Sequence, residues 1–136
     1  MKILVIDGQG GGVGKTLIAA LKREMPTQPL IALGTNTQAT AAMLKAGASA
    51  GATGENAVRV NCRRADVIAG PIGIVLADAL LGEITPEMAR CVAASPARKV
   101  LLPMQKCHIQ VAGVAQLTTQ ELVEDAVRRI LEGQKQ

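Results

Sequence analysis

Short runs of aliphatic residues alternate along this chain with stretches in which apolar residues recur every three or four positions. The runs predict buried strands, and the periodic stretches predict helices with one apolar face. The predicted strands span residues 2–7, 29–36, 65–71 and 99–103, with a candidate fifth strand at 108–113. The predicted helices span residues 13–24, 37–47, 57–63, 85–95 and 118–133.

This alternation of strands and helices is typical of βαβ units built on a parallel sheet. We therefore predict an α/β fold of the three-layer, Rossmann-like type. In such a fold a mainly parallel sheet, here of about four to five strands, carries helices on both faces. A chain of 136 residues has the length of one domain, so residues 1–136 are expected to form a single domain.

Two stretches have weaker patterns. Residues 46–56 are rich in glycine and are predicted to form a loop. Residues 72–84 are mostly apolar, and periodicity does not separate a buried helix from a strand there. We favour a helix, because Gly82 ends the apolar stretch and a new helix start follows, with Thr85 as its cap and Pro86 in its first position.

The helix predicted at 118–133 has the clearest boundary signals. Thr118 and Glu121 have the spacing of a capping box, and Leu117 with Leu122 has that of a hydrophobic staple. Gly133 is expected to end the helix. The polar face is expected to carry ion pairs between residues four positions apart, Glu124 with Arg128 and Asp125 with Arg129.

The composition narrows the classes of partner. The chain has no Phe, Tyr or Trp, so it lacks the aromatic stacking that usually holds single-stranded nucleic acid. The net charge of +4 is mild, and the densest basic cluster, Arg59, Arg63 and Arg64, is too small for a nucleic-acid-binding surface. We therefore predict no nucleic-acid partner.

The cysteines and the N-terminal apolar run bear on disulfides, metal sites and cellular location. Cys62, Cys91 and Cys107 have no CxxC spacing, which predicts neither a disulfide framework nor a metal site. Cys107 and His108 are neighbours in a candidate strand, so their side chains are expected to point to opposite faces. The apolar run before Asp7 is too short for a signal peptide or a membrane span. We expect a cytoplasmic protein with no membrane partner.

The sequence VIDGQGGGVGKT, residues 5–16, places a glycine-rich loop between the first predicted strand and helix. A helix N-terminus carries unpaired N–H groups and partial positive charge, so it attracts phosphate. Glycines let the backbone come within hydrogen-bond range of that phosphate. Gly8, Gly10, Gly11, Gly12 and Gly14 are more glycines than a packed turn requires, so we predict a phosphate site.

Two common phosphate-binding motifs do not fit this loop. The dinucleotide motif G-x-G-x-x-G fails because its last position falls on Val13 or Lys15, depending on which glycine begins it. The P-loop motif G-x-x-x-x-G-K-[ST] matches at Gly14, Lys15 and Thr16, but its first position falls on Gln9.

The loop resembles the variant P-loop K-G-G-x-G-K-T of partition-type ATPases, with Gly10 at the position of their signature lysine. This resemblance implies an ATP- or GTP-binding switch, which we keep as an alternative. A P-loop enzyme also needs an aspartate at the end of another strand to hold magnesium. The predicted strands 65–71 and 99–103 end without one, and Asp78 lies in a predicted helix.

The loop also resembles the G-x-x-x-G-x-G loop of short-chain dehydrogenases, which Gly8, Gly12 and Gly14 match. Asp7 stands where that family usually has threonine. The resemblance implies that the loop binds NADP or NAD. A basic residue after the last glycine, here Lys15, is common in the NADP-using members of that family.

The end of the second predicted strand bears on the choice between the two cofactors. An NAD enzyme has an acid there that binds the adenosine ribose, whereas this chain has Thr35 and Asn36. NADP is therefore slightly favoured over NAD. The catalytic Tyr-x-x-x-Lys motif of the short-chain dehydrogenases cannot exist in a chain without tyrosine, so we predict no catalytic residue.

Over nearly its whole length the chain resembles a family of short bacterial proteins of unknown function. The resemblance is carried by VIDGQGGGVGK, ALGTN, AMLKAGA, GATGEN, GPIGI and LGEITPEMA. It implies a Rossmann-like fold and a cytoplasmic location, but no activity, so the sequence leaves open whether the protein is an enzyme.

Ligands of open parallel sheets bind beyond the carboxyl ends of the strands, where three loops of this chain should meet. Residues 53–56 are a further candidate contact, although we favour a helix cap with an acid in its first turn as their role. A third interpretation is an oligomeric binding module that is not an enzyme. We expect a homo-oligomer under each of the three interpretations. The candidate cofactor-binding residues are Gly8, Gln9, Gly10, Gly11, Gly12, Val13, Gly14, Lys15, Thr16, Thr35, Asn36, Gly70, Pro71 and Ile72.

Overall fold

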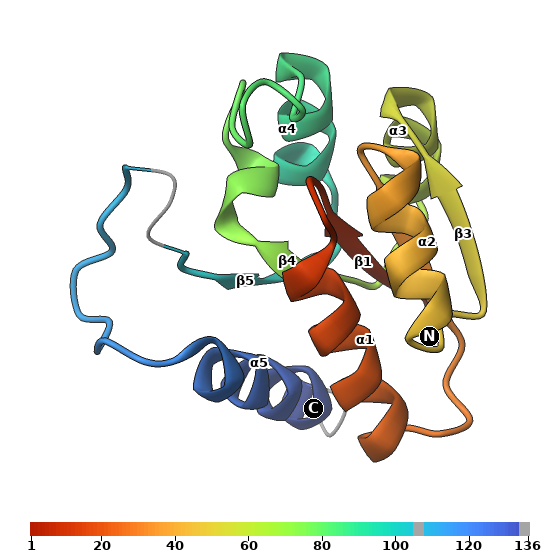
Figure 1. The fold of residues 1–136 in the computed structure, drawn as a ribbon, viewed down its shortest axis with the longest axis vertical. Coiled ribbons are helices and arrows are strands. Elements are labelled where there is room, and N and C mark those ends of the chain that lie inside the picture. Colours follow the sequence, from red (N-terminus) through yellow and green to blue (C-terminus); the bar gives the residue numbers. More distant parts are fainter. Residues whose placement is uncertain (105–107, 134–136) are drawn as a thin grey trace.

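A computed structural model describes residues 1–104 and 108–133 of the chain (Figure 1). Its sheet has five strands in the order β3-β2-β1-β4-β5, and every neighbouring pair is parallel. This arrangement confirms the predicted α/β, Rossmann-like fold. The strands are β1 (Ile3–Asp7), β2 (Leu30–Gly34), β3 (Ala50–Thr53), β4 (Val67–Pro71) and β5 (Arg98–Leu102).

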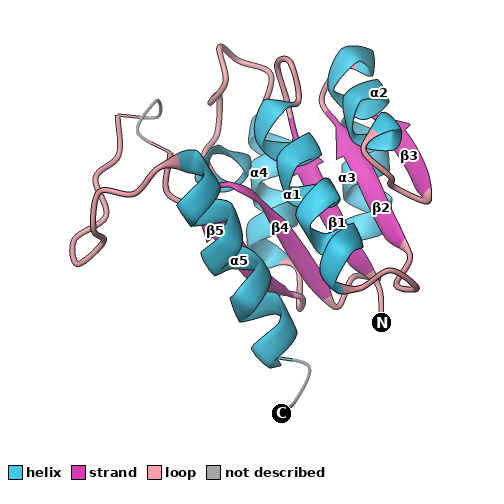
Figure 2. Cartoon of the chain, turned by 60° about the horizontal axis from the view of Figure 1, so that its bottom comes forward, coloured by secondary structure: helices cyan, strands magenta, loops and turns pink. Residues whose placement is uncertain are grey.

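Helices cover both faces of this sheet (Figure 2). On one face lie α1 (Gly12–Glu24), α2 (Thr37–Lys45) and α5 (Thr119–Gly133), with α1 in the middle. On the other face α3 (Glu55–Cys62) packs beside α4 (Pro86–Ala94), and a short 3-10 turn, η1 (Ile72–Val75), follows β4. No helix in these described ranges is both long and apolar enough to cross a membrane.

The central strand β1 shows how the sequence produces this layering. All five of its residues are buried. Ile3 and Val5 point into the core beneath α1 and α5, whereas Leu4 and Ile6 point into the core beneath α3 and α4. A strand with both faces covered needs a continuous apolar run, which is the pattern that the sequence has there.

Polar side chains cap the starts of three helices, and two of these caps, those of α4 and α5, were predicted. The Asn36 side-chain oxygen accepts a hydrogen bond from the Ala39 N–H, 2.8 Å away, at the start of α2. Thr85 caps α4 by accepting from the Met88 N–H at 3.1 Å. Thr118 and Glu121 form the predicted reciprocal capping box before α5, with bonds of 3.1 and 3.0 Å.

One of the two ion pairs predicted on α5 is present, and the other has different partners. Arg129 pairs with Asp125 at 2.7 Å. Arg128 pairs with Asp125 and Glu132, and not with Glu124. Residues three positions apart are also neighbours on a helix surface, so Asp125 serves both arginines.

Three predicted elements are wrong. Residues 46–56 contain the edge strand β3, which is held by pairing with β2 rather than by its own alanine and glycine side chains. Residues 72–84 are not a helix beyond η1, because the backbone turns repeatedly there. Residues 108–113 form no strand and lie exposed in the connection to α5, which runs out from the sheet in Figure 1.

The cysteine predictions are tested at two of the three positions. Cys62 and Cys91 are buried free thiols in α3 and α4. Burial raises the pKa of Cys62 to about 11, so this thiol is held in its neutral form. Cys107 lies outside the described residues, and its expected geometry with His108 stays a prediction.

Candidate functional site

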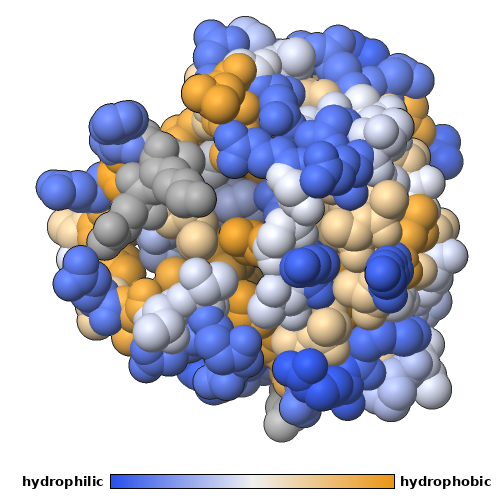
Figure 3. Space-filling model, in the orientation of Figure 1, coloured by the Kyte–Doolittle hydropathy of each residue, from blue (hydrophilic) through white to orange (hydrophobic). Residues whose placement is uncertain are grey.

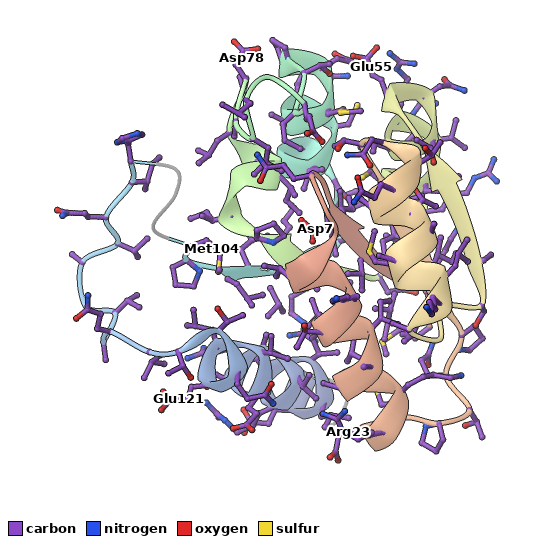
Figure 4. The ribbon with its side chains drawn as sticks, in the orientation of Figure 1. Asp7, Arg23, Glu55, Asp78, Met104 and Glu121 are labelled. Carbon is purple, nitrogen blue, oxygen red and sulfur yellow. The ribbon has the colours of Figure 1, made fainter. Side chains whose placement is uncertain are left out.

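The loops of interest leave the carboxyl edge of the sheet on both sides of its central strand. From β1 the chain proceeds to β2 and β3 on one side, and it then crosses to β4 and β5 on the other. Such a reversal of strand order opens a crevice at the strand ends, where open parallel sheets bind ligands. Figure 4 labels Asp7 at this place, where β1 ends and α1 begins.

The Asp7 side chain ties the glycine loop to the end of β1. It is only 4% exposed, and its two oxygens accept hydrogen bonds from the Gly8 N–H at 2.8 Å and the Gly14 N–H at 2.6 Å. Burial raises the pKa of Asp7, and the N–H groups of Gly14 and Gly8 oppose that rise. The start of α1 is thus held to β1 by a buried carboxyl group.

Three of the five loop glycines are required by packing. A Cβ on Gly8 would lie 2.6 Å from the Thr35 hydroxyl, and one on Gly11 would lie 2.9 Å from the α-carbon of Ala39 in α2. A Cβ on Gly14 would lie 2.6 Å from the Met43 sulfur. Gly11 also has a left-handed backbone, with φ of +73°, which favours glycine.

Gly10 and Gly12 differ from these three. A Cβ on either would have no neighbouring atom within 4 Å, so packing does not explain why these positions lack side chains. Both residues are exposed at the start of α1. Within the described part of the chain, their N–H groups have no hydrogen-bond acceptor. Two unpaired donors on an open glycine surface are suited to an anion.

Glu83 is part of this site, although sequence reasoning did not find it. One of its oxygens, Oε1, accepts hydrogen bonds from three donors. They are the Gln9 N–H at 2.8 Å, the Thr35 hydroxyl at 2.6 Å and the Asn36 amide at 2.8 Å. The Thr35 hydroxyl and the Gln9 N–H lower the pKa of Glu83, so its carboxylate stays charged.

No local sequence signal points to Glu83, because its partners lie 47 to 74 positions away. It belongs to residues 76–84, which we call the crossing segment. This segment doubles back on itself, with the Asp78 N–H donating to the Ile84 carbonyl at 2.7 Å. Its Leu80 side chain lies over Gly8, at 2.8 Å from where a Cβ would be. The crossing segment therefore covers part of the glycine loop.

The crossing segment also explains why the helix predicted there does not form. Asp78, Leu80 and Leu81 have φ of 65°, 56° and 56°, and Gly82 has φ of 90°. These left-handed conformations are incompatible with a right-handed helix. Asp78 is exposed and, in Figure 4, stands far from Asp7, so it does not end a strand beside the loop.

The structure gives local roles to several other predicted site residues. Lys15 is exposed on α1, and the Thr16 hydroxyl donates back to the Gly12 carbonyl at 2.8 Å. Val13 packs at the margin of the core. Gly70 lies directly against the Ile6 carbonyl, which leaves no room for a side chain. Pro71 ends β4, and Ile72 begins η1.

Residues 53–56, which join the end of β3 to the start of α3, have structural partners. The Thr53 hydroxyl lies 2.7 Å from that of Thr40. Glu55 accepts from Thr85 at 2.6 Å and from Arg59 at 3.1 Å, which joins α3 to α4. Among residues 1–104 and 108–133, no group of three or more His, Cys, Asp or Glu side chains is arranged to hold a metal ion.

The chain belongs to a family described as a domain of unknown function, DUF3842, whose model matches residues 2–135. This finding confirms the resemblance to proteins of unknown function. No curated protein matches the sequence. A dodecameric FMN-dependent UbiX-like decarboxylase from Escherichia coli O157:H7 is similar in structure, with 16% identity and a TM-score of 0.45. The match covers 100% of this chain and 96% of that one, and we transfer none of its chemistry at this similarity.

Proposed function

We propose that this protein binds a nucleotide at the carboxyl edge of its sheet, with a phosphate group held by the N–H groups of Gly10 and Gly12. A dinucleotide, NADP or NAD, is the first candidate. The observation that carries the proposal is the contrast among the loop glycines. Gly8, Gly11 and Gly14 are required by packing, whereas Gly10 and Gly12 leave open space and unpaired donors.

The energetic cost of those two glycines supports a role in binding. A glycine loses more conformational freedom on folding than alanine, which costs about 0.5–1 kcal/mol in regular structure. Packing does not offset this cost at Gly10 or Gly12, because a Cβ at either position would have no neighbouring atom within 4 Å. A ligand that approaches the backbone closely would explain these glycines, because a Cβ at either position would clash with it.

An ATP- or GTP-binding switch is the second candidate, and the sequence Gly14-Lys15-Thr16 is the observation in its favour. One observation weighs against it. Asp78 lies in the crossing segment, away from any strand end, so it is poorly placed to bind that ion.

Calorimetric melting of the whole chain tests the proposal, and calorimetry suits a protein without aromatic absorbance. The ligands are NAD, NADP, their reduced forms, FMN, and ATP or GTP with and without magnesium. At 100 times its dissociation constant a ligand adds about 2.7 kcal/mol of stability, so the melting midpoint should rise by several degrees. A rise with NAD or NADP that does not depend on magnesium is the expected result.

Two other results of the melting experiment would contradict dinucleotide binding. A rise only with ATP or GTP plus magnesium would replace the dinucleotide with the switch, since phosphoryl transfer requires the ion. No rise with any ligand at millimolar concentration would overturn nucleotide binding. The protein would then be a binding module whose partner is of another kind.

We further propose that the protein is a homo-oligomer. The connection from β5 to α5 exposes four large apolar side chains, Ile109, Val111, Val114 and Leu117, each at least 40% accessible. Figure 3 shows a hollow with apolar surface beside this connection. Sedimentation velocity should show a species larger than 14.1 kDa. A single sharp monomer boundary at high concentration would refute this proposal.

A further inference from the structure

We infer that Glu83 selects nucleotides whose adenosine ribose has free 2′- and 3′-hydroxyl groups, and that it excludes a ribose with a 2′-phosphate. This inference rests on the nucleotide binding proposed above and specifies its ligand. It makes NAD, and not NADP, the preferred dinucleotide. The preference expected from the end of β2 alone was the opposite.

The position of the Glu83 carboxylate relative to β2 supports this selection. In Rossmann-like sheets the adenosine ribose lies by the end of β2, where an acidic side chain accepts its hydroxyl groups. Here β2 ends at Gly34, and neutral Thr35 and Asn36 follow. Glu83 contacts both of them, at 2.6 and 2.8 Å. The crossing segment thus supplies, from a distant part of the sequence, the acid that β2 lacks.

The two oxygens of the Glu83 carboxylate differ in their hydrogen bonds. All three donors of the site, Gln9, Thr35 and Asn36, bond to Oε1 of Glu83. Oε2 has no donor within the described ranges of the chain. A carboxylate oxygen offers two acceptor positions, so Oε2 can accept a ribose hydroxyl while Oε1 keeps the side chain oriented.

Two carboxyl groups determine the charge of the crevice. Asp7 and Glu83 both present carboxyl groups to the glycine loop, through Gly8 and Gln9. Neither forms an ion pair within the part of the chain that the structure describes. A 2′-phosphate would place like charge beside a Glu83 carboxylate that no ion pair among the described residues neutralises, whereas a neutral diol would not.

The experiment compares the dissociation constants of NAD and NADP, measured by isothermal titration calorimetry on the full chain. For the wild-type protein we expect NAD to bind at least about tenfold more tightly, a difference of about 1.4 kcal/mol. In Glu83→Gln the ratio should fall to near one, because the repulsion of the 2′-phosphate is removed. Glu83→Asp keeps the charge and should keep the preference for NAD.

Glu124→Gln is the matched control. It removes the same charge from the exposed face of α5, away from the crevice, and should leave the wild-type ratio unchanged. Equal binding of NAD and NADP to the wild type, or an unchanged ratio in Glu83→Gln, would overturn the role of Glu83. The wild-type comparison stands even if Glu83→Gln does not fold. Failure of both ligands to bind would instead refute the proposed dinucleotide site, on which the role of Glu83 rests.

Discussion

The Thr35 hydroxyl donates a hydrogen bond of 2.6 Å to the Glu83 carboxylate, and this contact joins loops that are 48 residues apart. The same oxygen accepts from the Gln9 N–H. One carboxylate therefore connects the loops after β1 and β2 with the crossing segment. This connection sets the charge and the shape of the crevice at the carboxyl edge of the sheet.

The contrast between the loop glycines predicts that binding and stability respond to different substitutions. Gly12→Ala should leave the protein as stable as the wild type or more stable by up to about 1 kcal/mol, because the Cβ has space and the unfolded chain loses freedom. The same variant should lose nucleotide binding. Calorimetric melting with and without the nucleotide measures both effects.

Gly14→Ala is the matched comparison. Its Cβ would lie 2.6 Å from the Met43 sulfur and 2.9 Å from the Asp7 Cβ, so it should cost about 1–3 kcal/mol of stability. A Gly12→Ala variant that destabilises as much as Gly14→Ala would contradict the assignment of open space at Gly12.

Asp7 and Glu83 should give stability opposite dependences on pH. Burial raises the pKa of Asp7 above 3.8, so its contribution to stability is full below that pH and is lost as the pH rises through the folded-state value. Hydrogen bonds lower the pKa of Glu83 below 4.5, so its contribution is present above that pH and is lost as the pH falls.

Melting midpoints of the wild type, Asp7→Asn and Glu83→Gln between about pH 3 and pH 7 measure this pair of effects. As the pH rises, Asp7→Asn should gain stability relative to the wild type. Glu83→Gln should lose stability relative to the wild type over the same range. If the stability of both variants relative to the wild type changed in the same direction with pH, one of the two assigned pKa shifts would be wrong.

Arg98 is predicted to hold the C-terminal end of α5 on the sheet. Its guanidinium donates to the carbonyl groups of Arg129 and Ile130, at 3.0 and 3.1 Å, and places positive charge at the helix C-terminus. Arg98→Ala should cost about 1–2 kcal/mol in chemical denaturation. Arg128→Ala removes an arginine from the exposed face of α5 and should cost about 0.5 kcal/mol or less. Equal losses would argue against this role for Arg98.

The capping box before α5 gives a fourth prediction. Thr118→Ala removes the hydroxyl that accepts from the Glu121 N–H, and it should cost about 1 kcal/mol. Thr119→Ala, one position further on, changes an exposed threonine that is already inside the helix. Urea denaturation should separate the two variants. The cap would have no energetic role if Thr119→Ala were the more damaging change.

Local signals were sufficient wherever an element depends on its own side chains. The continuous apolar run of β1 and the caps at Thr85 and Thr118 predicted what the structure has. In each case the interaction that decides the structure lies within a few residues, or is simple burial on both faces of a strand. The alternation of strands and helices was sufficient to predict the α/β class.

Tertiary contacts determined the elements that the sequence did not predict. β3 has small side chains and is mostly exposed, so only its pairing with Ile31 to Gly34 of β2 makes it a strand. The crossing segment has the composition of a helix but repeated left-handed residues. Glu83 reaches the site only because this segment folds over Gly8, a relationship that no local pattern encodes.

The position of β1 in the sheet has a consequence for how the chain folds during synthesis. β1 pairs with β4 from Ile3 opposite Val67 to Val5 opposite Ala69, a separation of 64 positions. Ribosomes add about 5–20 residues per second, so one edge of this apolar strand waits about 3–13 s for its partner. A nascent chain that stops before β4 therefore presents an unpaired aliphatic edge, which is the kind of surface that chaperones and aggregating chains both recognise.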